Sequence, residues 1–188
     1  REVQRQIRKY GRAIIATDGS CIGNKHKKRV AGYGVATGNL NKHGQLGGID
    51  QTAYMAELWA LYKTLKSIQD CQGEIWIIID NLAVQREADA RKRLNAGIGI
   101  GIWWEIGKLI DTCKDVQFHW VPSHGKREGK WTAPETHDTK EWRKLNARAD
   151  KEAGISSKER WDDERPIRQQ WVRDTNIATA ALQRLDMG

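Results

Sequence analysis

The sequence predicts an α/β fold with a mixed five-stranded sheet that carries helices on both faces. Segments rich in strand-forming residues alternate along the chain with segments of helical periodicity. The first three strand-like segments follow one another closely, whereas each of the later two is preceded by helices, an order typical of antiparallel and then parallel pairing. A chain of 188 residues is long enough to bury one core, so we expect one domain.

The first three strands are predicted to form an antiparallel meander. Residues 13–17 are a short apolar run that ends at Asp18. The Gly-rich segments 31–38 and 44–50 are joined by the turn-like sequence NLNKH, residues 39–43. Because these connections are short, we expect consecutive strands to pair with each other.

The next part of the chain is predicted to pack a helix against the sheet and add a parallel strand. In residues 52–68 the apolar side chains of Leu58, Leu61 and Leu65 recur at helical spacing, which predicts an amphipathic helix. Residues 74–80, EIWIIID, are apolar almost throughout, as is typical of a strand buried on both faces.

Three further helices and the last strand complete the predicted order. Helices are expected at residues 83–94 and 103–113, separated by the Gly-rich sequence NAGIGIGI. The fifth strand is predicted at residues 116–121, before Pro122, and a polar loop then leads to a helix at residues 141–153. We assign residues 13–154 to the domain, with a basic N-terminal extension over 1–12 and a charged helical C-terminal extension over 155–188.

The charge balance favours a polyanionic partner. Lys and Arg number 32 against 24 Asp and Glu, a formal net charge of +8, which suits nucleic acid first and an anionic membrane surface second. No apolar run approaches transmembrane length, and the first residues lack the pattern of a secretory signal. The three cysteines are odd in number and far apart, which favours reduced thiols and an intracellular location.

Four carboxylates fall at the rim of the predicted sheet. Asp18 and Asp80 each follow an apolar strand, and Glu57 borders the inward stripe of its helix. Asp150 borders the stripe of the last helix, four residues after Asn146. Taken singly, each acid is more typical of a turn, a cap or a solvated helix face. Four in these positions together indicate a site.

Carboxylates crowded against a core require a cation. Burying an ionised carboxylate without a partner costs several kcal/mol, and neither strand end has Lys or Arg as an immediate neighbour. Oxygen ligands without a cluster of His or Cys favour Mg²⁺. Two such ions, about 3.5 to 4 Å apart, can activate a water and stabilise the leaving oxygen of a phosphoryl displacement.

Six motifs in one order carry a family resemblance. TDGSCIGN, GYGV, AEL, IIIDN, WVPSHG and NARADKEA, spread over residues 13–153, resemble ribonuclease H of type 1, and QTAYMAEL and VPSHG are most similar to retroelement domains. The resemblance implies the ribonuclease H-like fold and cleavage of the RNA strand of RNA/DNA hybrids with two Mg²⁺ ions, for which Mn²⁺ can substitute. It implies that the metal-binding, catalytic carboxylates are Asp18, Glu57, Asp80 and Asp150.

The same resemblance implies further site residues. His124 matches a loop histidine that assists proton transfer or product release. Contacts to the hybrid, including the 2′-hydroxyls that distinguish RNA from DNA, are implied for a set of small and polar residues. They are Gly19, Ser20, Cys21, Asn24, Asn81 and Asn146.

The sequence also departs from the family pattern. The loop that follows His124 is long, and the Gly-rich segment 97–104 lies where some members have a basic protrusion. The basic segments 25–29 and 1–12 are therefore expected to bind the phosphates, although such charge runs are also typical of solvated surface. Trp131, in the polar loop, is a candidate for base stacking.

The sequence leaves two other functions open. One is a DNA-acting polynucleotidyl transferase of the same fold, and the other is a non-catalytic hybrid-binding or scaffold module. The expected partners are an RNA/DNA hybrid and a reverse transcriptase domain of the same polyprotein, with no membrane, and the protein is expected to be a monomer.

Overall fold

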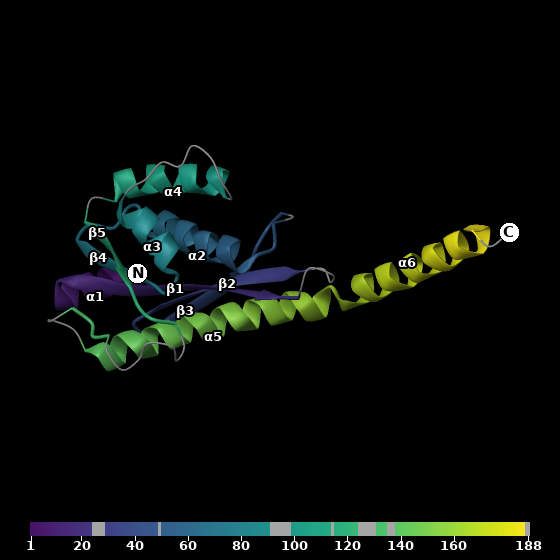
Figure 1. Cartoon of the computed structure of the whole chain (residues 1–188). Coiled ribbons are helices and arrows are strands. Elements are labelled where there is room, and N and C mark those ends of the chain that lie inside the picture. Colours follow the sequence, from purple (N-terminus) through teal and green to yellow (C-terminus); the bar gives the residue numbers. More distant parts are fainter. Residues whose placement is uncertain are drawn as a thin grey trace.

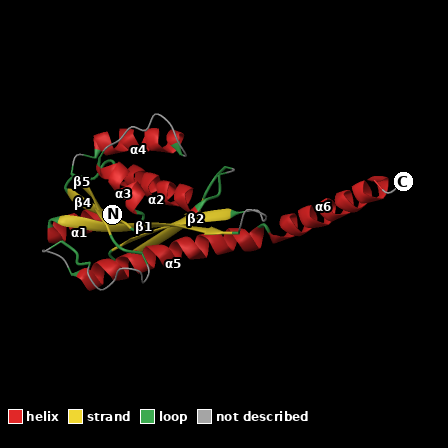
Figure 2. Cartoon of the chain, viewed as in Figure 1, coloured by secondary structure: helices red, strands yellow, loops and turns green. Residues whose placement is uncertain are grey.

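The computed structural model has one mixed sheet of five strands in the order β3-β2-β1-β4-β5 (Figures 1 and 2). β1 pairs antiparallel with β2, and β2 with β3, whereas β4 pairs parallel with both β1 and β5. This arrangement confirms the predicted fold class. The strands are β1 (Arg12–Ile22), β2 (Val30–Thr37), β3 (Leu40–Gln45), β4 (Glu74–Ile79) and β5 (Val116–Trp120).

The structure describes most of the chain. The described residues are 1–23, 29–48, 50–90, 99–113, 115–123, 131–134 and 138–186, with side chains to residue 177. The helices are α1 (Glu2–Tyr10), α2 (Ala53–Ile68), α3 (Leu82–Asp89), α4 (Ile100–Thr112), α5 (Thr139–Asp163) and α6 (Arg165–Asp186). Among these residues no helix is long and apolar enough to cross a membrane.

The two faces of the sheet bury different clusters because strand side chains alternate in direction. On one face Ile15 and Ile77 pack with Leu58 and Leu61 of α2 and with Ile106 of α4. On the other face the core packs against α5 through Ala16, Trp76, Ile78, Trp142 and Ala149. Figure 1 shows α2 and α4 on one side of the sheet and α5 on the other.

The predicted meander has the right pairing but the wrong turn. Residues 39–43 were expected to connect two strands, yet β3 begins at Leu40 and the turn is only Gly38 and Asn39. Gly38 has a positive φ of 51°, a conformation that two-residue hairpin turns require and that glycine adopts at low cost. The expected strand at 44–50 therefore begins and ends too late.

Several helix ends also differ from the predictions. The Gly-rich segment was expected to stay non-helical up to residue 102, but α4 starts at Ile100, directly after Gly99. α3 ends at Asp89, and residues 91–94 of its predicted range lie outside the described part. The last domain helix was predicted at 141–153, but α5 runs to Asp163.

The first helix contacts the sheet, and the end of α5 contacts the segment that follows β3. The Gln6 side chain of α1 donates to Thr37 Oγ1 at 2.9 Å and accepts from the Ile14 amide at 3.4 Å. Arg160 of α5 donates to the Leu46 carbonyl and, at 3.1 Å, to Gln51 Oε1. Residue 154 lies inside α5, so helical structure is continuous across it; the three-part division of the chain stays a prediction. α6 extends away from the sheet (Figure 1).

Candidate active site

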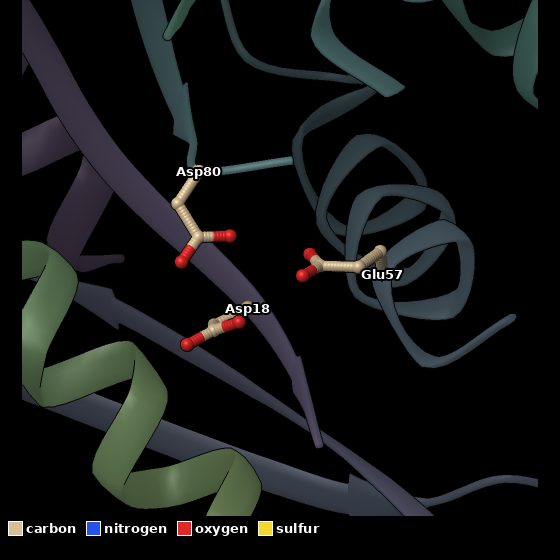
Figure 3. Close-up of side chains that lie close together, drawn as sticks. All are labelled: Asp18, Glu57 and Asp80. Carbon is tan, nitrogen blue, oxygen red and sulfur yellow. The ribbon is translucent and has the colours of Figure 1, made fainter. Parts of the chain in front are cut away.

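Three of the four predicted carboxylates meet at one point. Asp18, Glu57 and Asp80 each place an oxygen within 4.8 Å of the others. Figure 3 shows these side chains directed toward one another from a strand, a helix and the end of a second strand. Their convergence joins residues that are far apart in the sequence.

The parallel pairing of β1 and β4 places Asp18 beside Asp80. The last paired residues are Thr17 and Ile79, so the two aspartates are the next residues on neighbouring strands. The prediction that Asp18 ends its strand is wrong: β1 continues to Ile22, paired antiparallel with β2. Asp18 instead lies where β1 loses its parallel neighbour, and this opens the sheet at that position.

Glu57 is brought to the sheet by a close approach of α2. The helix begins after Thr52, whose hydroxyl accepts a hydrogen bond from the Met55 amide at 3.1 Å. Its first turn rests on Gly19 of β1, where an added Cβ would collide with the Glu57 amide and lie 2.7 Å from the Ala56 carbonyl carbon. Glu57 is only 6% exposed as a result.

A second glycine brings α5 against Asp18. In the β1–β2 register the partner of Asp18 is Gly34, and a Cβ on Gly34 would collide with the Ala149 carbonyl of α5. Asp150, the next residue of α5, lies close enough for its charge to raise the pKa of Asp18. The fourth carboxylate is thus an electrostatic neighbour of Asp18, outside the three that meet within 4.8 Å.

Burial and the repulsion between the carboxylates disfavour ionisation of Asp18 and Glu57. Burial, first, and the charge of Asp80, second, raise the pKa of Asp18 to about 8. Burial and the charges of Asp18 and Asp80 raise the pKa of Glu57 well above its usual range. Within the described part of the chain, neither Asp18 nor Glu57 forms an ion pair with Lys or Arg.

The site fits a hard divalent cation. The side-chain donors are all carboxylate oxygens, and Glu57 Oε2 is buried with no hydrogen-bond partner, so it has an unused lone pair inside the cluster. A cation bound here would supply the positive charge that the cluster lacks.

The other predicted site residues have varied surroundings. The Gly19 amide donates to Asp18 Oδ1 at 2.7 Å, and Ser20 accepts from Ser157 at 3.2 Å. Cys21 Sγ lies 3.4 Å from the Gln51 carbonyl oxygen. The Asn81 side chain caps α3 by accepting from two amides of its first turn. Their roles toward a substrate stay predictions.

The structure describes only some of the remaining predicted residues, which are Asn146, His124, Asn24, the basic segment 25–29 and Trp131. Asn146 is buried on α5, and its Oδ1 has no hydrogen-bond partner. Asn24 and His124 lie outside the described residues, as does most of segment 25–29. Trp131 is partly buried and packs near Trp142, with ring centroids 6.2 Å apart, so its ring is only partly available for stacking.

Sequence reasoning did not find the role of Gly34. The sequence feature that could have indicated this role is the series of small residues in β2, which leaves space for a helix to cross the strand.

The family model for RNase H matches residues 11–158. The match covers most of the chain, and the chain therefore belongs to the RNase H family and is classed as a ribonuclease H enzyme. No curated protein shows significant similarity to it.

Solved structures have the same fold. The RNase H domain of prototype foamy virus is 22% identical with a TM-score of 0.60, over 77% of this chain and 93% of that domain. The foamy viral protease-reverse transcriptase bound to RNA/DNA hybrid is 21% identical with a TM-score of 0.59, over 77% of this chain but only 20% of that protein. The compost metagenome enzyme LC11-RNase H1, bound to RNA/DNA hybrid, is 18% identical with a TM-score of 0.57, over 80% and 99% of the two chains.

The Gly19→Ala substitution is expected to destabilise the protein. The new methyl group meets backbone atoms of α2, which cannot move without displacing Glu57, so we expect a loss of about 1–3 kcal/mol and a decrease in Tm of roughly 3–10 °C. Thermal unfolding measures the effect. Gly47→Ala is the matched control, because a Cβ there meets nothing within 4 Å. Equal Tm values for both variants would contradict the close approach of α2.

Asp18→Asn is expected to stabilise the metal-free protein at high pH. The pKa of Asp18 is raised above its unfolded value, so its contribution to stability is complete below about pH 4 and is lost as the pH rises to about 8. The amide does not ionise and avoids this loss. Urea unfolding in EDTA should therefore show a stability gain of a few kcal/mol at pH 8 and little at pH 4.

The control for this experiment is Asp89→Asn, at an exposed end of α3. Because Asp89 lies outside the acid cluster, this variant tests whether a pH-dependent gain is specific to the cluster. A gain for Asp18→Asn that is the same at pH 4 and pH 8 would show that Asp18 ionises normally.

Proposed function

We propose that this chain hydrolyses the RNA strand of RNA/DNA hybrids with two bound divalent metal ions. The convergence of Asp18, Glu57 and Asp80, with Asp150 nearby, is the observation that carries the proposal. The family membership supports the reaction class, and two structural neighbours were solved in complex with RNA/DNA hybrid.

Each carboxylate would have a distinct part in holding the ions. Asp18 and Asp80, on neighbouring strands of the sheet, would bind on its open edge, while Glu57 would bind from the buried side through its unpartnered oxygen. Asp150 would complete the set from α5. The chemistry that two bound Mg²⁺ ions, or Mn²⁺ in their place, would supply here is activation of a water and stabilisation of the leaving oxygen. Because the carboxylates are held by packed elements, little reorganisation is needed on binding.

Residues near the acids would position the hybrid and move protons. We assign proton transfer, or assistance to product release, to His124. Contacts to the ribose would come from Ser20, Cys21, Asn24 and Asn146. Gly19 and Asn81 would contribute mainly through the backbone, since the Asn81 side chain already caps α3.

We further propose that the domain works inside a retroelement polyprotein, as a monomer within the cell, with a reverse transcriptase domain in the same chain. The motifs QTAYMAEL and VPSHG and the likeness to a foamy viral protease-reverse transcriptase support this context. The chain spans about a fifth of that viral protein.

Asp80→Asn is expected to abolish cleavage but not binding. Loss of a carboxylate ligand removes several kcal/mol of transition-state stabilisation, so the rate with Mg²⁺ should decrease by about 10³-fold or more. Cleavage of labelled hybrid and its binding in EDTA are measured side by side. Asp89→Asn, an acid outside the cluster, should cleave at the parent rate.

Substrate choice tests the alternative functions in the same assay. The parent protein should cleave hybrid and leave duplex DNA and duplex RNA intact. Cleavage of DNA strands would indicate a polynucleotidyl transferase, and tight binding without any cleavage would indicate a non-catalytic module.

Hybrid binding is expected to weaken steeply with salt. Neutralisation of about five phosphates by Lys and Arg predicts a loss of affinity of roughly 100-fold or more between 50 and 200 mM salt. Fluorescence anisotropy with labelled hybrid in EDTA gives the slope. A flat response would exclude phosphate contacts by residues 1–12 and 25–29 as the main source of affinity.

A further inference from the structure

Two of the three cysteines lie at the same end of the sheet, opposite the acids. Cys71 precedes β4 and Cys113 precedes β5, and these two strands are parallel neighbours. Their pairing begins at Ile75 and Val116, and the Ile75 amide donates to the Asp115 carbonyl at 2.9 Å. The segments that carry the two cysteines therefore approach the sheet side by side.

A cavity of about 580 Å³ lies between these segments. Both cysteines line it, together with Asp70 and Asp115. Cys113 is 6% exposed and belongs to the core, whereas Cys71 is partly exposed. Burial raises the pKa of the Cys113 thiol, and the neighbouring Cys71 and Asp70 raise it further.

The donor set does not suit a metal ion. Among the described residues, the acids of the active site are the only group of three or more His, Cys, Asp or Glu side chains with ligand atoms close enough for one ion. The two thiols thus lack a third ligand in range, and zinc sites use four ligands or three with a water. A disulfide between the two thiols needs no third ligand from the protein, only an oxidant.

We propose that Cys71 and Cys113 are a redox pair that forms an intramolecular disulfide by exchange with a small-molecule disulfide such as oxidised glutathione. Both are free thiols in this structure. The Cys71 thiolate, the more accessible, attacks the reagent and releases one glutathione thiolate. The Cys113 thiolate then attacks Cys71 Sγ and releases the second. The two protons lost by the cysteines are taken up by the two glutathione thiolates, so one disulfide is reduced as another forms.

The disulfide would stabilise the domain at a place distant from the acid cluster. It would close a loop from residue 71 to residue 113, which contains β4, α3 and α4. Asp80 lies in this loop, but at the opposite end of β4 from Cys71. Cross-linking a long loop restricts the unfolded chain, so the oxidised form should be more stable.

The test is oxidation of the full chain under native conditions. The protein is equilibrated with oxidised glutathione, remaining thiols are alkylated, and peptides are mapped by mass spectrometry. We expect a peptide linking Cys71 to Cys113, and a Tm for the oxidised form that is higher by roughly 5–10 °C than for the reduced form. Reduction with dithiothreitol should reverse both changes.

Two variants make the result specific. Cys71→Ser should abolish the linked peptide and the increase in Tm, whereas Cys21→Ser, which alters the cysteine on β1, should preserve both. Two outcomes would overturn the proposal. One is Cys71 bound to glutathione while Cys113 remains a free thiol and is recovered alkylated; the other is a linked peptide that contains Cys21. An experimental structure with the two Cα atoms more than about 7 Å apart would also overturn it.

Discussion

The structure depends on the close approach of α2 and α5 to the sheet around a group of acids that repel one another. Asp18 and Asp80 lie where the parallel pairing of β1 and β4 stops, and α2 and α5 close on Asp18 from either face. That approach is available only because Gly19 and Gly34 have no side chains. Without it the carboxylates would spread into water, ionise normally and lose their shared geometry.

Packing of the apolar core offsets the loss of stability caused by burying carboxylates that repel one another. β4 is buried from Ile75 to Ile79, and it leads directly into Asp80. The two faces of this strand pack into separate clusters, one beneath α2 and α4 and the other beneath α5. A conflict between local electrostatics and global packing is typical of functional sites, where geometry is retained at a cost in stability.

Periodicity predicted a mixed sheet, the order of helices and strands along the chain, and acids directly after apolar strands, because these patterns are visible in the sequence. It did not predict that β4 lies beside β1. It could not give the length of β1, since the polar sequence DGSCI is held as strand only by pairing with β2. The last domain helix was likewise predicted to end at residue 153, but α5 continues because Ser156 and Ser157 are buried against the sheet at Gly32. The tertiary contact overrides the local preference in both cases.

The long α5 explains why the antiparallel half of the sheet matters to the site. Before Asp150, Arg148 donates to the Gly38 carbonyl at 2.5 Å and to Asn41 at 2.9 Å. After it, Glu152 lies 2.6 Å from His43, and Arg160 reaches the Leu46 carbonyl. Asp150 is therefore placed by the β2–β3 hairpin, whereas Asp18 and Asp80 are placed by parallel pairing. β1 belongs to both halves, so a shift in the hairpin would move one carboxylate relative to the others.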